Sequence, residues 1–440
     1  MWRGLAVAAA LALTAAACST SEPSPRHRLI GFNFVVDDLN VRTELVTLDP
    51  KTLRAHGRIL RIDDGLVDET DASATSAVGQ LSPDRKTLAV GTSSGRVLLL
   101  DPARLRRAGS ISVRRGSDVV VAADSWPRAD RLLVVYGLFS TFNTWGDSLA
   151  VIDPTSRKVL NRTRLNGFVE HAEKQKNGSL LLLVRRRGSP PRIVAVSPGG
   201  RIRSFPLPAP VGLPGQHVGS RFFAARAWPA VATDGEGHAF VVREGSPLLE
   251  VDVASGRVRA HAVALTRSSL GLPQPPPWPA GSRGPDLVYG RSVRWLGRGL
   301  IGIGGGVNRP VRIGGQIGQR YRPYGYEVVD TRTWRIVRKM GLTGCDAAFG
   351  VYLCSESVGG FPPDSKGSRG SSLVTFDRSW KLLYRKRSRS LWRDVIAGRF
   401  LAGEADGSRM SVLDPRTGGV VRRLGSMRVW PPELLDWRAG

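Results

Sequence analysis

The sequence predicts an all-β fold, a β-propeller of four-stranded antiparallel blades, with eight blades favoured and seven as the alternative. Short apolar runs separated by clusters of Gly, Pro, Asp and Ser indicate many short antiparallel strands. One apolar run that ends in Asp recurs every ~40–50 residues, which is the length of a propeller blade. The last segment of the chain can also add a strand to the first unit. Because one four-stranded sheet cannot cover both of its faces, such units are expected to stack around an axis and close into a ring.

The repeating unit is clearest in Leu81–Ser112. The turn Ser82–Arg85 precedes an apolar run that ends at Val90, and a second turn leads into Val97–Leu100. Asp101 ends that run, and a further short strand follows it. Runs of four to six β-prone residues between such turns are typical of antiparallel strands.

The recurring run ends in Asp, or once in Ser, because of turn chemistry. An Asp carboxylate accepts backbone N–H hydrogen bonds from residues just ahead of it, and the following Pro, Thr-Gly or Ser-Gly completes the reversal. The eight runs end at Asp49, Asp101, Asp153, Ser197, Asp252, Asp330, Asp377 and Asp414. These residues are therefore interpreted as turn formers rather than as catalysts.

The ends of the chain predict how the ring closes. The first unit offers three strands, Leu29–Val36, Thr43–Asp49 and Arg54–Leu60. Val429–Trp437 can supply the missing innermost strand. This pairing would tie the two ends of the propeller together, and it favours eight blades over seven.

The unit between Asp252 and Asp330 is the longest. It contains a Pro-rich segment, Gln274–Pro279, and a Gly-rich segment, Gly302–Gly318, and both are expected to be loops. Long loops on a rigid scaffold often carry function. The role of the 271–323 loops is left open by the sequence.

The segments Ser82–Val90 and Val97–Asp101 resemble a blade of the YVTN or quinoprotein-dehydrogenase-like propellers. The resemblance extends from about residue 29 to residue 437 and is strongest over 75–160 and 405–425. Propellers of this kind serve as enzymes, scaffolds and sensors, so the resemblance implies a fold and not an activity.

Quinone-dependent relatives carry Trp docking motifs in their blade turns, and this sequence departs from that pattern. Asp414, Thr417 and Gly418 lack the Trp, whereas Asp330–Trp334 has the Trp inside the turn. No quinone cofactor is therefore expected. The Trp residues are expected to fill blade interfaces or to line loops.

The N-terminus has the three-part layout of a secretory signal. Met1–Arg3 carries a positive charge, and the uncharged run Leu5–Ala17 is too short to span the ~30 Å of bilayer hydrocarbon. The run ends at Cys18 and so resembles a bacterial lipoprotein signal, which implies lipidation of the Cys18 thiol, although Ala15 stands where that family usually has Leu. Ordinary cleavage near the Ala run is the alternative. The expected divisions are a signal peptide at 1–18, a Ser/Pro tether at 19–28 and a single propeller domain at 29–440.

With these features, the chain is similar to exported actinobacterial propeller lipoproteins. The chain is therefore expected at the outer face of the cell membrane, held there by its lipid anchor, and as a monomer.

Two cysteines beyond Cys18 predict a disulfide. If the chain turns between Phe349 and Gly350, Cys345 and Cys354 oppose each other on antiparallel strands. Opposed residues have Cα atoms ~4.5–5.5 Å apart, within disulfide reach. Such bonds form outside the cytoplasm. Two reduced thiols or a metal pair are the alternatives.

The net charge of +27 comes mostly from arginine and limits the class of partner. Arg104–Arg107, Arg185–Arg187 and Arg385–Arg389 are clusters. Export argues against nucleic acid and favours anionic wall polymer or lipid headgroups. The other reading is that these arginines are solvated positions that protect sheet edges from pairing.

An acidic residue follows most of the turn markers at a nearly constant distance. In a propeller this place is the entry to the innermost strand, near the mouth of the central channel. The candidate ligand-binding residues there are Asp118, Glu170, Asp346, Asp394 and Asp436, together with His171 next to Glu170. Converging carboxylates could hold a divalent cation through oxygen ligands. The alternative is that these acidic residues are there for structural reasons, because Asp is a common turn-forming residue at the start of a strand.

The preferred functional reading is a binding or scaffold module for a protein or small-molecule ligand. No Gly-x-Ser-x-Gly elbow, P-loop or His pair with metal-ligand spacing is present, and no catalytic residue is named. The first alternative is a propeller enzyme of the lyase, lactonase or dehydrogenase type, using the channel carboxylates with a divalent cation. The second is an Arg-rich binder of anionic wall polymer or lipid headgroups.

Overall fold

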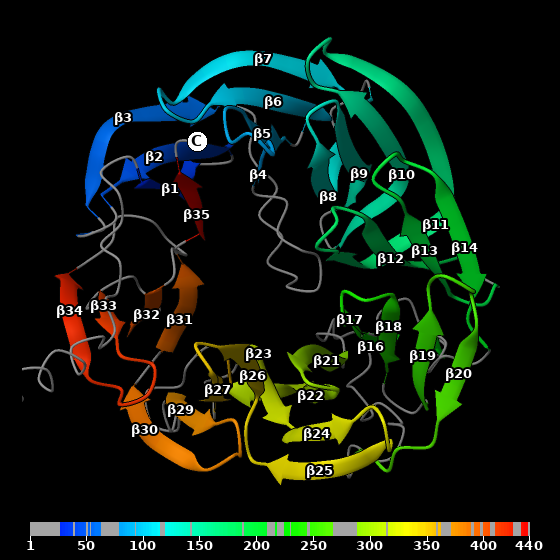
Figure 1. The fold of residues 1–440 in the computed structure, drawn as a ribbon, viewed down its shortest axis with the longest axis vertical. Helices are drawn as coiled ribbons and strands as arrows, with labels where there is room; N and C mark the ends of the chain where they lie inside the picture. Colours follow the sequence, from blue (N-terminus) through cyan, green and yellow to red (C-terminus); the bar gives the residue numbers. More distant parts are fainter. Residues whose placement is uncertain are drawn as a thin grey trace, which may run out of the picture.

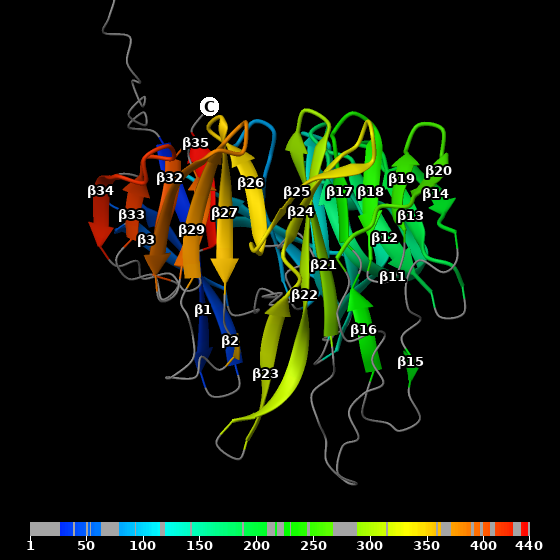
Figure 2. The same cartoon turned by 90° about the horizontal axis from the view of Figure 1, so that it is seen from below.

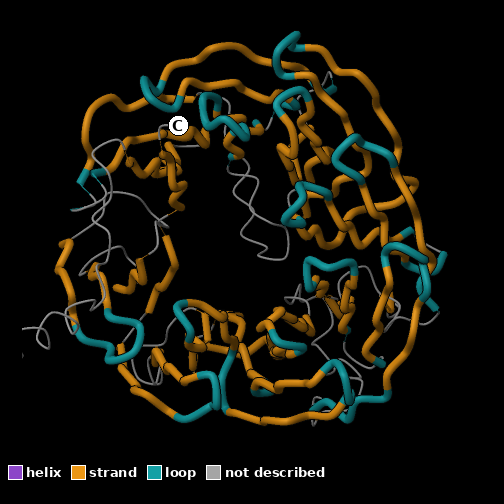
Figure 3. The backbone as a smooth tube through the Cα atoms, in the orientation of Figure 1, coloured by secondary structure: helices purple, strands orange, loops and turns teal. Residues whose placement is uncertain are grey.

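The computed structural model shows a closed ring of eight four-stranded antiparallel blades (Figure 1). It describes residues 27–37, 40–49, 52, 54–62, 79–92, 94–114, 119–140, 143–186, 189–208, 216–217, 224–228, 230–243, 247–266, 288–313, 316–357, 360–361, 371–388, 391–396, 399–404, 410–425 and 433–438. Within these ranges every regular element is a strand, joined by short turns (Figure 3), and no helix is long and apolar enough to cross a membrane. The predicted fold class and blade number are confirmed.

In the first four blades the strands follow one another from the axis outward. Blade 1 contains β35 (Glu433–Arg438), β1 (His27–Asp37), β2 (Asn40–Leu48) and β3 (Ala55–Ile62). Blade 2 contains β4 (Gln80–Leu81), β5 (Leu88–Gly91), β6 (Arg96–Asp101) and β7 (Arg106–Ser112). Blade 3 contains β8 (Val119–Arg128), β9 (Arg131–Ser140), β10 (Asn143–Asp153) and the first part of β11 (Lys158–Lys174). Blade 4 contains the second part of β11, then β12 (Leu180–Arg185), β13 (Arg192–Val196) and β14 (Ile202–Pro206).

The other four blades follow the same order. Blade 5 contains β17 (Ala230–Thr233), β18 (His238–Val242), β19 (Leu248–Asp252) and β20 (Val258–His261). Blade 6 contains β21 (Val288–Gly297), β22 (Leu300–Ile313), β24 (Tyr326–Asp330) and β25 (Arg335–Met340). Blade 7 contains β26 (Gly344–Ala348), β27 (Val351–Ser357), β29 (Ser371–Asp377) and β30 (Leu382–Ser388). Blade 8 contains β31 (Leu391–Ile396), β32 (Arg399–Glu404), β33 (Met410–Leu413) and β34 (Val420–Gly425). The remaining strands β15 (Gln216–His217), β16 (Ala224–Trp228), β23 (Gln316–Pro323) and β28 (Gly360–Phe361) extend the blade 6 sheet.

The ring closes through the two ends of the propeller, as predicted. β35 pairs antiparallel with β1, and Asp436 lies opposite Leu29. The C-terminal strand is thus the innermost strand of the blade that the N-terminal strands begin.

The turn markers lie at the end of the third strand of each blade and act as predicted. Asp101 Oδ1 accepts hydrogen bonds from the backbone N–H of Ala103 (2.9 Å) and of Arg104 (3.1 Å). Asp414 Oδ1 does the same for Arg416 and Thr417, and the hydrogen bond from the Thr417 N–H is the main reason that the pKa of Asp414 lies below its ordinary value. Equivalent side-chain acceptors are Asp49, Asp153, Ser197, Asp252, Asp330 and Asp377.

The turns after Asp330 and Asp252 also hold adjacent blades together. Trp334, with φ +56°, stacks its ring on His261 of the preceding blade at 3.4 Å between centroids. Gly256, with φ +77°, lies so close to blade 4 that an added Cβ would be 2.6 Å from the Phe205 ring. Trp334 therefore fills a blade interface, as expected for the Trp residues. The apolar core consists of clusters of this kind between neighbouring blades, for example Ile30 and Ile62 with Leu88.

The prediction that Gly302–Gly318 is a loop is wrong. Residues 300–313 form β22, which continues beyond its blade as a hairpin with β23. Two positions of this strand are glycine because neighbouring groups leave no room for a side chain there. An added Cβ at Gly302 would overlap the Tyr326 hydroxyl, and one at Gly304 would be 2.6 Å from the Thr343 carbonyl oxygen. The Pro-rich segment Gln274–Pro279 lies outside the described residues.

Candidate functional site

Asp346 is the candidate carboxylate that the structure describes most fully. It lies on β26, the innermost strand of blade 7, directly after Cys345. Alternation along the strand buries Cys345, whereas the Asp346 side chain is 51% exposed. Because this side chain is exposed on an innermost strand, it can meet a ligand.

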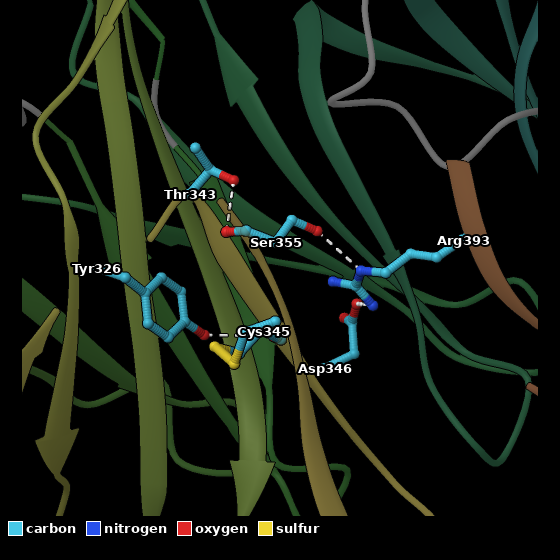
Figure 4. Close-up of a disulfide and its surroundings, with 7 residues drawn as sticks. Tyr326, Thr343, Cys345, Asp346, Ser355 and Arg393 are labelled. Atoms are coloured by element: carbon cyan, nitrogen blue, oxygen red, sulfur yellow. Dashed lines mark hydrogen bonds and ion pairs between the residues drawn. A yellow bond between two sulfur atoms is a disulfide. The ribbon is translucent and has the colours of Figure 1, made fainter. Parts of the chain in front are cut away.

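The predicted disulfide is present and fixes this strand. Cys345 lies opposite Cys354 in the register of β26 and β27, with a Cα–Cα distance of 4.0 Å. The hairpin turns at Phe349 and Gly350, both with positive φ, where the sequence predicts the turn. The buried Tyr326 hydroxyl donates a hydrogen bond to the Cys345 carbonyl oxygen at 3.3 Å. Figure 4 shows the disulfide with Tyr326 beside Cys345.

Two arginines from the neighbouring blades neutralise Asp346. Arg393 Nη1 of β31 lies 3.0 Å from Asp346 Oδ2, and Arg294 Nε of β21 lies 3.9 Å from Oδ1. Arg393 Nε also donates a hydrogen bond to Ser355 Oγ at 2.8 Å, which orients its guanidinium (Figure 4). One carboxylate thus connects the innermost strands of blades 6, 7 and 8. A cation at Asp346 would have to compete with both guanidinium groups.

Tyr326, beside this ion pair, does not ionise near neutral pH and so does not act as a general acid or base. Burial is the main reason that the pKa of its phenol is raised above the ordinary value, and the Asp346 charge raises it further. The phenol therefore stays protonated and keeps its hydrogen bond to the strand.

His171 lies far along the ring from Asp346, on the second part of β11. Its Nε2 is 3.0 Å from Glu173 Oε1, and its Nδ1 is buried without a hydrogen-bond partner among the described residues. The described partner of His171 is thus Glu173, two residues ahead on the same strand. The side chain of Glu170 is not among the described parts of the structure.

The other candidate positions can be placed only in part. The backbones of Glu170, Asp394 and Asp436 lie on the innermost strands β11, β31 and β35, as the sequence predicts for this acidic position. Their side chains, and all of Asp118 and Cys18, lie outside the described residues. Whether the carboxylates converge therefore stays a prediction. Among the described side chains, no group of three or more His, Cys, Asp or Glu residues is arranged to hold a metal ion.

The sequence reasoning did not identify Asp124, which is one of several buried charged residues. Asp124 on β8 is 4% exposed, and burial raises its pKa to about 6. The positive charge of Lys174 at the end of β11 partly offsets this rise, and burial lowers the pKa of that ammonium. An Asp inside the apolar run Val119–Ala123 and Trp126 is the signal that could have identified it. Since it is closed to solvent, Asp124 is a structural group rather than a site for substrate.

Comparison with known proteins supports the fold alone. No protein-family model matches the chain, and no curated protein does. Dihydro-heme d1 dehydrogenase NirN in complex with DHE is similar in structure with a TM-score of 0.56 and 10% identity, over 95% of this chain and 76% of that one.

Two further solved structures are less similar. BamB from Moraxella catarrhalis has a TM-score of 0.45 and 11% identity, over 85% of this chain and 91% of its own. Quinohemoprotein alcohol dehydrogenase ADHIIG from Pseudomonas putida HK5 has a TM-score of 0.44 and 12% identity, over 92% of this chain and 74% of its own. At such low sequence identities, none of these similarities supports assigning an activity to this chain.

Proposed function

We propose that this protein is a lipid-anchored extracytoplasmic propeller that acts as a binding or scaffold module for a protein partner. The observation that carries the proposal is the asymmetry of the ring. The β22–β23 hairpin projects from one face, and the β1–β2 hairpin and β16 extend on the same side (Figure 2). Projecting elements on a rigid ring are where propellers and other scaffolds commonly bind partners.

The projecting hairpin is built as a sheet rather than as a free loop. Gly306–Ile313 pair with Gln316–Pro323 in continuous register. β28 adds to β23, and β16 pairs parallel with β21 at the base. A preorganised edge loses less conformational entropy on binding than a flexible loop does.

The composition of the hairpin indicates the charge of the partner. Its sequence contains Arg309, Arg312, Arg320 and Arg322 and no Asp or Glu. A partner with an acidic surface would therefore be guided to this face and held in register there.

The lipid anchor and the outer-face location rest on the N-terminal sequence. The Cys345–Cys354 disulfide supports an oxidising compartment. Incorporation of labelled palmitate into the full chain, with Cys18→Ser as the control, tests the anchor. Label that persists in Cys18→Ser would refute lipidation at this residue.

A photo-crosslinking amino acid tests the binding face in native membranes. Placed at Arg312 in the hairpin, it should give a discrete adduct with one protein. Placed at Val421, which is 62% exposed on the outer strand β34, it should give none. Replacing residues 307–322 with an Asn-Gly turn should abolish the complex while the ring keeps its melting temperature. Equal adducts from both positions, or a complex that survives the shortening, would refute the proposal.

Metal analysis of the same purified protein addresses the enzyme alternative. A stoichiometric divalent ion that is lost in Asp118→Asn and Asp394→Asn would replace the binding proposal with the channel-carboxylate enzyme.

A further inference from the structure

An open groove of about 610 Å³ lies where the outer strand of blade 2 meets blade 3. Its lining includes Arg114, Arg162 and Arg164 together with Tyr136, Asp147 and Ser148. This volume is within the ~300–1,000 Å³ range of small-molecule sites. The groove lies at a blade junction and is separate from Asp346 and from the projecting hairpin.

A β-bulge shapes the groove. Gly146 and Ser148 of β10 pair with the consecutive residues Gly137 and Tyr136 of β9, so Asp147 is the extra residue. Bulges redirect a side chain and are common beside functional sites. The same register places Ser148 opposite Arg164 of β11. Tyr136, Ser148 and Arg164 therefore form a row across three strands.

The charges in the groove are unbalanced. Arg162 is held in place because its Nε donates a hydrogen bond to the Val113 carbonyl oxygen at 2.9 Å. Asp147 Oδ1 accepts a hydrogen bond from Ser148 Oγ at 2.8 Å. Within the described part of the chain, no carboxylate lies within 4.0 Å of Arg114, Arg162 or Arg164.

Among the described lining residues, three guanidinium groups thus share one groove with a single carboxylate, and no ion pair joins it to any of them. Guanidinium groups form bidentate hydrogen bonds with phosphate oxygens, and such an anion would relieve their mutual repulsion.

Tyr136 adds a hydroxyl to the lining of the groove. Its side chain is 4% exposed, and no hydrogen bond joins its hydroxyl to another described residue. The hydroxyl is not one of the buried polar atoms that lack a partner in the described part of the chain. A ligand oxygen in the groove would give it a hydrogen-bond partner.

We propose that this groove binds a phosphorylated polyol or sugar. Arg114 and Arg164 bind the phosphate oxygens beside the fixed guanidinium of Arg162, and the Tyr136 hydroxyl donates a further hydrogen bond. Asp147 Oδ2 is available to accept a hydrogen bond from a ligand hydroxyl, which favours a hydroxylated phosphate ester over inorganic phosphate. The same chemistry occurs in a free phosphate ester and in the repeat of a polyol-phosphate polymer.

Isothermal titration of the purified full chain tests the groove with glycerol 3-phosphate, inorganic phosphate and glycerol. Glycerol 3-phosphate should bind saturably and more tightly than inorganic phosphate, glycerol should not bind, and affinity should fall with rising salt. Arg164→Gln and Arg114→Gln should each weaken binding about tenfold or more, equivalent to about 1.4 kcal/mol. Tyr136→Phe should weaken it several-fold, and Asp147→Asn should reduce the preference for the ester over inorganic phosphate.

Arg422→Gln is the matched control. Arg422 is exposed on the outer strand of blade 8, so this variant removes the same charge at another part of the ring and should leave binding unchanged. Absence of saturable binding, or an equal loss in Arg422→Gln, would overturn the proposal.

A poly(glycerol phosphate) chain separates the two ligand sources. If glycerol 3-phosphate and the polymer compete, a higher affinity per phosphate for the polymer identifies the polymer as the source, and equal affinity identifies the free ester. Polymer binding that glycerol 3-phosphate does not displace would show a general charge effect and would also overturn the proposal. The crosslinks from the hairpin are expected to be unaffected by the groove variants, so the two proposals can fail separately.

Discussion

Gly256→Ala tests how neighbouring blades are held together. Gly256 lies in the turn after the third strand of blade 5, with φ +77°, and faces the outer strand of blade 4. A Cβ there would be 2.6 Å from Cδ1 and 2.8 Å from Cε1 of Phe205. The Phe205 ring is 7% exposed and packs among Leu181 and Leu183, so it cannot move aside freely. The substitution should therefore strain both the backbone and the blade interface.

The expected cost has two parts. A non-Gly residue in the left-handed region costs about 1–2 kcal/mol. Overpacking a closed interface costs about 1–3 kcal/mol more. The free energy of unfolding should thus fall by about 2–5 kcal/mol in Gly256→Ala. Gly297→Ala is the matched control, because Gly297 has φ +83° and no atom within 4 Å of an added Cβ, so it should cost only the backbone part.

Urea unfolding of both variants and of Phe205→Ala provides the measurement. Phe205→Ala alone should cost about 3–5 kcal/mol because it empties a buried site. In the double variant with Gly256→Ala, removal of the ring also removes the clash, so the total should fall short of the sum by about 1–3 kcal/mol. Equal losses for Gly256→Ala and Gly297→Ala, or simple additivity in the double variant, would refute the packing account.

Three further predictions concern stability. Replacing both Cys345 and Cys354 with Ala should lower the free energy of unfolding by about 2–3 kcal/mol, the loop-closure value for so short a loop, and reductant should destabilise the wild type but not this variant. Because burial raises the pKa of Asp124 to about 6, above the ordinary 3.8, its folded form binds a proton more tightly than its unfolded form. The stability that Asp124 contributes should be complete below about pH 4 and be lost as the pH rises through 6, which lowers the free energy of unfolding by up to about 3 kcal/mol. This decline should be absent in Asp124→Asn when unfolding is measured from pH 4 to 7. Asp414 has a lowered pKa, so its contribution should be present above pH 4 and be lost on acidification; Asp414→Ala should cost about 1 kcal/mol in thermal unfolding at pH 7 and less at pH 3.

The candidate site could be predicted in position but not in its interactions. Spacing from the turn markers places Asp346 on an innermost strand, and the structure has it there. Its partners Arg294 and Arg393 come from other blades, on strands about 50 residues away along the chain. A periodic pattern specifies which residues alternate on a strand, but it does not specify which side chains of two strands will meet. For this reason the sequence suggested a cation ligand where the structure has a carboxylate paired with two guanidiniums.

By itself, the sequence predicted the repeat, the closing strand and the Asp turns, and it favoured eight blades over seven and a Cys345–Cys354 disulfide over free thiols or a metal pair. All of these depend on local hydrogen bonding and on the period of apolar residues, which a linear pattern records. Only the tertiary structure decided that the Gly302–Gly318 segment is a hairpin, that Asp124 is buried, and that three arginines line one groove. Each of these depends on side chains and backbone of separate strands packing within a few ångströms of one another, and the tertiary structure determines which ones meet.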